Sequence, residues 1–141
     1  MSARPAPTFT AGRILAATFA VAAVAGLTLA PRSWAWPARS WALDAVALLP
    51  TRWADFLLGG DADRALNIAI FVPLGAAIAA LLPLRWVPAS VGVGFAISCG
   101  VEIAQTVIPG RVPDVADIVA NTAGALVGTV LVLAVRLIAR L

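Results

Sequence analysis

Three carboxylates and two side-chain amides interrupt the apolar C-terminal half of this chain, and they are the residues best suited to chemistry. Of the 141 residues, 62% are hydrophobic and only seven are acidic. Carboxylates can act as a general base, bind Mg²⁺ or Ca²⁺ through their oxygens, or pair with another cation. The group consists of Glu102, Gln105, Asp114, Asp117 and Asn121.

The spacing of these residues places them on two helix faces. Glu102 and Gln105 are three residues apart, so they share one face of a helix. Asp114, Asp117 and Asn121 follow an i, i+3, i+7 pattern at the start of the next apolar run. Each helix therefore presents its polar side chains in one direction.

Four apolar runs supply the elements that must position these side chains. A membrane-spanning helix needs about 20 mostly apolar residues. We expect transmembrane helices near residues 12–30, 65–84, 86–108 and 115–135. The predicted fold class is therefore all-α integral membrane, with a short tail over 1–11 and one membrane domain over 12–141.

Alternating helix directions bring the end of the third helix and the starts of the second and fourth to one side of the membrane. Asn67 lies in the first turn of the second helix, and Arg111 lies in the turn before the fourth and can reach over the other residues. We expect a polar mouth between these helices. Its members are Asn67, Glu102, Gln105, Arg111, Asp114, Asp117 and Asn121.

Each of these residues also has a structural interpretation. Asp114 suits a helix N-cap, and Asp117 three residues later completes an arrangement like a capping box, worth about 1 kcal/mol. The amides can link helices, and Arg111 can simply extend its charged end to the interface. Glu102 is the costly residue, because an acid at the centre of a membrane helix costs roughly 2.5–3.5 kcal/mol. It is either protonated in an apolar site or ionised and paired, with Arg111 or with a cation.

The composition excludes several kinds of site. The chain has no histidine, and its single cysteine, Cys99, cannot form an internal disulfide. The ten basic residues are all arginines, scattered singly between apolar runs, so the pI near 11.1 does not indicate nucleic-acid binding. We predict the lipid bilayer as a partner, with no cofactor and no metal site, and a homo-oligomer remains open.

Arginines at the helix ends give a weak indication of orientation. Arg4 and Arg13 precede the first helix, and Arg85, Arg136 and Arg140 fall on the same side if the helices alternate. We therefore expect a multi-pass protein of the cell membrane, with both termini in the cytoplasm and the mouth outside. The first apolar stretch also resembles a signal peptide, but it is long enough to span a membrane, and we expect a retained helix.

The segment between the first two expected helices is rich in tryptophan, which favours the membrane interface. Its apolar clusters are too short to span a bilayer. We predict two interfacial helices here, with an irregular loop as the alternative. The tryptophans of the segment are Trp34, Trp36, Trp41 and Trp53.

Small residues and a proline indicate where helices approach one another. Pro73 should kink the second helix. Gly75 with Ala79, and Gly124 with Gly128, form pairs of small residues four apart that allow close contact between helix backbones. We therefore expect Pro73, Gly75, Gly124 and Gly128 to serve helix packing.

Three sequence blocks resemble those of the VanZ-like family. They read NIAIFVPLG at 67–75, VEIAQ at 101–105 and RVPDVADIVANTAGALVG at 111–128, with the family spacing intact. The resemblance covers residues from about 61 to 136. Many members have Lys-x-x-His where this chain has Arg64 and Asn67, which puts any mechanism needing that histidine in doubt.

The resemblance implies a small multi-helix membrane protein. The family takes its name from a protein associated with teicoplanin resistance that acts without remodelling the end of the peptidoglycan precursor. The resemblance therefore points towards the cell envelope and glycopeptide resistance, and not to a particular reaction.

Two functions remain open. The first is a non-enzymatic cell-envelope protein whose outer-facing polar mouth binds a headgroup, a lipid-linked precursor, a drug or a partner, and so lowers glycopeptide sensitivity. The alternative is a membrane enzyme acting on envelope lipids through Glu102 or Asp117, with or without a divalent cation; no catalytic residue is assigned. A transporter is disfavoured, because the inner halves of the helices offer little polarity beyond Ser90 and Thr129.

Overall fold

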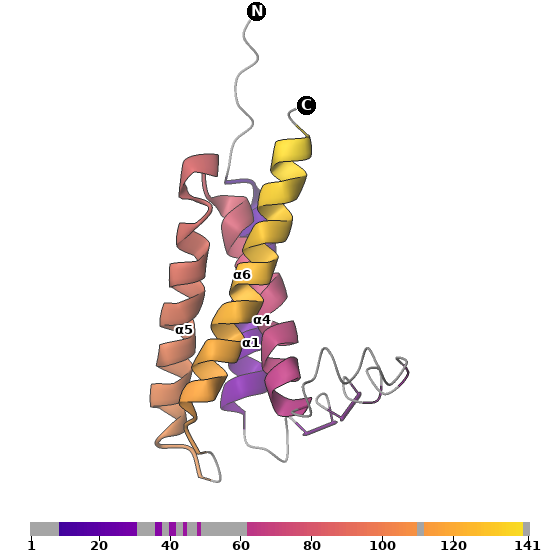
Figure 1. Ribbon diagram of the computed structural model, residues 1–141. Coiled ribbons are helices and arrows are strands. Elements are labelled where there is room, and N and C mark those ends of the chain that lie inside the picture. Colours follow the sequence, from indigo (N-terminus) through magenta and orange to yellow (C-terminus); the bar gives the residue numbers. More distant parts are fainter. Residues whose placement is uncertain are drawn as a thin grey trace, which may run out of the picture.

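A computed structural model describes residues 9–30, 62–109 and 112–139, together with isolated residues between 36 and 48. Within these residues the regular structure is helical. Figure 1 shows the four α-helices packed as one bundle, with α5 and α6 side by side. The elements in chain order are α1 (Ala11–Leu29), α4 (Ala62–Leu81), the 3₁₀ helix η1 (Leu84–Trp86), α5 (Ala89–Gln105) and α6 (Val115–Ile138).

Three of these helices are long and apolar enough to cross a membrane. They are α1, the Arg64–Leu81 part of α4, and α6. The fourth helix, α5, is apolar but has only 17 residues. Several spans in so apolar a chain make this a multi-pass membrane protein.

The third expected helix, near 86–108, is shorter at both ends in the structure. It begins only after Pro88, which occupies the N-cap position of α5, while Trp86 belongs to η1. At its other end the last regular turn gives way to i→i−3 backbone bonds, from Thr106 to Ile103 onward. Pro109 follows directly, and proline disfavours helical geometry in the residue before it.

The helices alternate in direction, and α4 and α6 run parallel to each other. Gly124 of α6 lies against Ile68 of α4, and Gly128, one turn later, lies against Val72. After α4 the chain therefore runs back through α5, in the opposite direction, before α6 begins. As a result, the first residue of α1 and the last residue of α6 lie at the same end of the bundle (Figure 1).

Glycines allow α4 and α6 to pack backbone against backbone. A Cβ added at Gly75 would lie 2.6 Å from the Cα of Ala125, and one at Gly128 would lie 2.7 Å from the backbone nitrogen of Ala76. Gly124 meets the backbone of α4 in the same way. Contacts this short leave no room for a side chain, so the two helices pack most closely where small residues face each other.

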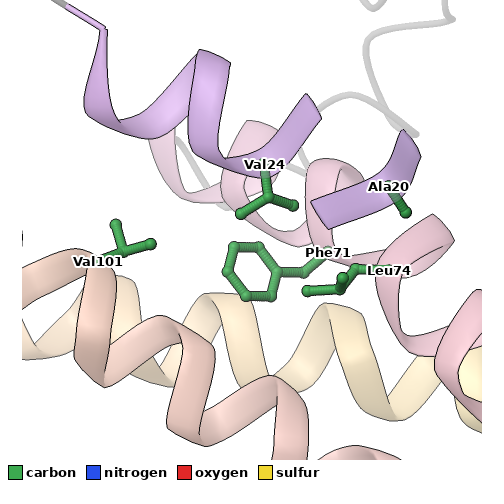
Figure 2. Close-up of a cluster of buried hydrophobic side chains, with 5 residues drawn as sticks. All are labelled: Ala20, Val24, Phe71, Leu74 and Val101. Atoms are coloured by element: carbon green, nitrogen blue, oxygen red, sulfur yellow. The ribbon is translucent and has the colours of Figure 1, made fainter. Parts of the chain in front are cut away.

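Apolar side chains hold α1 and α5 to this pair. Figure 2 shows Ala20 and Val24 of α1 facing Phe71 and Leu74 of α4, with Val101 of α5 completing the buried cluster. Phe71 and Leu74 are fully buried. Val101 directly precedes Glu102 in α5, so this apolar cluster adjoins the polar residues discussed below.

The structure places Pro73 on the outer surface, and it describes only part of the tryptophan-rich segment in which we predicted two interfacial helices. Pro73 lies within α4, but its side chain is exposed, so it faces away from the glycine-lined contact. Trp36 and Trp41 are exposed, whereas most of the tryptophan-rich segment lies outside the described residues.

Candidate functional site

The polar residues predicted from the sequence gather at the end of the bundle where α1 and α5 end and α4 and α6 begin. We call this end the mouth, and define it by Asn67, Glu102, Gln105, Asp114, Asp117 and Asn121. Arg111, which we also expected there, lies outside the described residues.

Asp114 starts α6 at the edge of the mouth. It occupies the N-cap position with extended backbone angles, and its Oδ1 accepts a 2.8 Å hydrogen bond from the backbone N–H of Ala116. Asp117 follows in the first turn, where a negative charge is favoured by the helix dipole. Both acids therefore suit the beginning of a helix.

Glu102, on α5, accepts a hydrogen bond from the residue that caps α6. In a capping box, a side chain three residues into the helix accepts the N–H of the N-cap residue. Here the N–H of Asp114 instead donates to Oε2 of Glu102, at 2.8 Å. This corrects the expectation that Asp117 completes a capping box, and it places the buried Glu102 carboxylate, 6% exposed, between the end of α5 and the start of α6.

Gln105 connects the mouth to α1. Its side-chain Nε2 donates to the backbone carbonyl of Thr28 at 2.9 Å. That carbonyl lies in the last turn of α1, where the helix has no amide of its own to offer. The amide is therefore a link between helices, and the mouth includes the end of α1 as well.

Asn121 lies one turn deeper than Asp117 and is only 2% exposed. Its Nδ2 donates to the Ser98 hydroxyl of α5 at 2.9 Å. Its Oδ1 is buried and has no hydrogen-bond partner among the described residues. Ser98 was not singled out from the sequence, although its place four residues before Glu102 puts it on the same helix face.

A regular register between α5 and α6 shows which residues lie level with each other. Ser90 and Thr129 share a 2.7 Å hydrogen bond, and four residues along, a Cβ on Gly94 would lie 2.5 Å from the Cβ of Ala125. The Asn121–Ser98 bond is the next step of this antiparallel ladder. One further step pairs Glu102 with Asp117. Two carboxylates therefore lie at the same level, one helical turn nearer to the end of the bundle than the Asn121 amide.

The first turns of α4 complete this end of the bundle. Asn67 is 5% exposed and precedes Ile68, whose backbone lies against Gly124. Because α4 and α6 are parallel, Asn67 is close to the level of Asn121. Arg64, one turn earlier, is exposed at the rim. The mouth thus combines acidic side chains at the rim with two buried amides beneath them.

The opposite end of the bundle is basic. Nη1 of Arg136 donates to the carbonyl oxygens of Leu82, at 2.7 Å, and Ala79, at 3.3 Å. These carbonyls are at the C-terminus of α4, where a cation is favoured. Arg85 in η1 and Arg13 in the first turn of α1 lie at this end too.

The side chains of the mouth offer mainly oxygen atoms to a ligand. Carboxylates and a side-chain amide oxygen accept hydrogen bonds and attract cations. Within the described ranges, no group of three or more histidine, cysteine, aspartate or glutamate side chains could hold a metal ion. The arrangement is therefore suited to binding a group that carries hydrogen-bond donors.

The family comparison accords with this geometry. The sequence model of the VanZ/LLP1 family matches residues 16–137. The chain belongs to the VanZ/LLP1 family. No curated protein and no solved structure matches it significantly.

The match takes in every helix of this VanZ/LLP1 protein, from within α1 to the last turn of α6. The three sequence blocks noted above meet in space. Asn67 and Glu102 bring the first two blocks to the mouth, and the third begins there and continues through Gly124 and Gly128 along α4. The same blocks therefore contain the residues of the mouth and the glycines of the close α4–α6 contact.

Proposed function

We propose that all four helices of this VanZ/LLP1 protein cross the membrane. α4 and α6 lie side by side, run in the same direction, and are each apolar and long enough to span. A chain that crosses twice in one direction must return between the crossings, and α5 with η1 is the return segment. Seventeen residues at 1.5 Å per residue give about 26 Å, close to the hydrocarbon thickness.

The mouth is assigned to the outer face of the membrane. Arg13, Arg85 and Arg136 lie at the opposite end of the bundle, and positively charged residues favour the cytoplasmic side; the preference is weak, because Arg64 lies at the mouth end. Both termini then lie in the cytoplasm. Glu102 and Asp117 face the cell envelope.

The function that this arrangement supports best is recognition of a polar headgroup at the outer membrane surface, without catalysis. The headgroup belongs to an envelope lipid, a lipid-linked precursor or a lipid-tailed glycopeptide, and its capture lowers sensitivity to teicoplanin-like drugs. One observation carries this function: a carboxylate, Glu102, is buried within an apolar bundle, and the register between α5 and α6 extends to Asp117 opposite it. Ionisable residues in membrane helices are costly and mostly functional.

Drug sensitivity in a glycopeptide-sensitive bacterial host tests this function. The host expresses wild-type protein, the double variant Glu102→Gln/Asp117→Asn, or the control Thr129→Val. Thr129 is buried in the same α5–α6 interface, but among the described residues its hydroxyl hydrogen-bonds to Ser90 and to Ala125 of its own helix. The measurements are the inhibitory concentration of teicoplanin, the binding of labelled drug to cells, and the membrane abundance of each variant.

We expect wild type and Thr129→Val to raise the inhibitory concentration and lower drug binding. The double variant should lose both effects at equal membrane abundance. Protection by the double variant equal to that of wild type, or no protection by wild type, contradicts the proposed function.

A further inference from the structure

The Asn121 amide is the part of the mouth that its hydrogen bonds within the bundle do not explain. One arm of the amide is bonded to Ser98, and Oδ1 is buried without a partner among the described residues. Leaving a buried acceptor unpaired costs roughly as much as a lost hydrogen bond, so such a group in a native protein calls for an explanation, and a bound group that donates to it is one. An apolar residue of the same shape, such as leucine, would avoid that cost.

Helix geometry inclines this side chain towards the mouth. Side chains on an α-helix lean towards its N-terminus. α6 begins at the mouth, so Asn121 leans towards the turn that carries Asp117. Ser98 holds its other arm on α5, one turn from Glu102. The amide therefore lies about 6 Å further into the bundle than the two carboxylates, because four residues of α-helix span that length.

The three groups are complementary to a compact cation that carries several N–H donors. Two carboxylates supply negative charge, and Oδ1 of Asn121 supplies a further acceptor that needs a donor. A primary ammonium group has three N–H donors and one positive charge. A quaternary ammonium has the same charge and none of the donors.

We propose that the mouth binds a primary ammonium group, with Glu102 and Asp117 on either side of it and Asn121 beneath it. This inference rests on the proposed function and names the chemistry of its headgroup. A lipid with an ethanolamine headgroup presents such an ammonium at the membrane surface. Arg64, near the start of α4, is exposed at the same end of the bundle and supplies a positive charge for the phosphate of that lipid.

Lipid binding by the purified full-length protein tests the inference. Short-chain phosphatidylethanolamine and phosphatidylcholine with identical acyl chains are titrated against the protein in detergent, and binding is measured by native mass spectrometry and by the melting temperature. Free ethanolamine is titrated separately, which distinguishes a lipid source of the ammonium from a soluble one. We expect phosphatidylethanolamine to bind about tenfold more tightly than phosphatidylcholine, which is about 1.4 kcal/mol.

Two variants separate ligand binding from packing. Asn121→Leu should bind phosphatidylethanolamine about tenfold more weakly, while the melting temperature of the lipid-free protein changes little, because the unpaired acceptor and the hydrogen bond to Ser98 are removed together. Ser90→Ala is the matched control in the same interface. It removes the Ser90–Thr129 bond and should lower the melting temperature slightly without changing lipid affinity.

Equal binding of the two lipids by wild type overturns the inference, even if Asn121→Leu proves too unstable to purify. Unchanged lipid affinity in a folded Asn121→Leu protein overturns it as well. Either result leaves the drug-sensitivity test untouched, since that test depends on the carboxylates and not on the class of headgroup. Tighter binding of free ethanolamine than of the lipid supports an ammonium site and assigns its ligand to a soluble amine.

Discussion

Glu102 links α5 to the first turn of α6 through a hydrogen bond. Its Oε2 accepts the backbone N–H of Asp114, the residue that caps α6, so an acid of α5 completes the first turn of its neighbour. The bond explains why an acceptor is needed at this position. It does not require a charge, because a neutral amide oxygen would accept the same N–H.

Substitution of Glu102 can separate these two roles. Glu102→Ala leaves the N–H of Asp114 without this acceptor and should lower the free energy of unfolding by about 1–3 kcal/mol. Glu102→Gln keeps an acceptor and should lose about 1 kcal/mol or less. Melting temperatures in detergent check this. Equal losses in the two variants would show that the charge itself supports the fold.

Gln105 makes a second prediction at the scale of single residues. Gln105→Leu removes the hydrogen bond to the Thr28 carbonyl and should cost about 0.6 kcal/mol, the average for a polar contact between membrane helices. The C-terminal turn of α1 should then exchange its amide hydrogens faster, while α6 is unaffected. Hydrogen exchange with mass spectrometry measures this, and unchanged protection of α1 would contradict the assigned role.

Among the described helices, α4 and α6 pack most closely. The backbones of the two helices touch at Gly75, Gly124 and Gly128, whereas a Cβ on Gly92 or Gly100 of α5 would meet nothing within 4 Å. Glycines in the same membrane protein thus differ in what they tolerate. The difference follows from which helix face each one occupies.

Alanine substitutions test this difference between elements. Gly128→Ala places a methyl group against the backbone of Val72 and Ala76, so α4 and α6 must separate, and we expect a loss of about 1–3 kcal/mol. Gly100→Ala should be neutral or gain up to about 1 kcal/mol from helix propensity. Thermal unfolding in detergent compares the two, and equal melting temperatures would contradict the close contact.

At the scale of the whole molecule, the two ends of the bundle differ in charge. One end has the acids Glu102, Asp114 and Asp117, and the other has Arg85 and Arg136. The positive-inside rule counts basic residues, and Arg64 at the mouth end opposes Arg85 and Arg136, so the rule gives only a weak preference for the second end in the cytoplasm. The orientation decides whether the mouth is open to the cell envelope.

Single cysteines report this orientation directly. In a Cys99→Ala background, Val112→Cys lies next to the mouth and Ala139→Cys lies at the opposite end, and both sites are exposed. A membrane-impermeant maleimide should label the first in intact cells and the second only after permeabilisation. The reverse pattern would place the mouth in the cytoplasm and contradict its role in the envelope.

Much of the candidate site was predictable, because residues three, four or seven apart on a helix share a face. That rule grouped Glu102 with Gln105 and Asp117 with Asn121, and the alternation of helix directions brought both groups to one end of the bundle. It could not identify the partner of each residue. The donor to Glu102 is the N–H of Asp114, a backbone group that looks the same in every sequence. Ser98 was missed because an isolated serine in an apolar helix gives no signal of its own.

The sequence by itself determined the membrane class, the order of the apolar helices that the structure describes, and the end of the bundle at which the polar residues lie. These follow from local hydropathy, since a helix in lipid must satisfy its backbone hydrogen bonds within itself. Only the tertiary structure decided the pairings Glu102–Asp114, Gln105–Thr28 and Asn121–Ser98. The physical reason is that such pairings depend on how each helix is rotated and shifted against its neighbour. Rotation and shift are set by close packing along the whole contact.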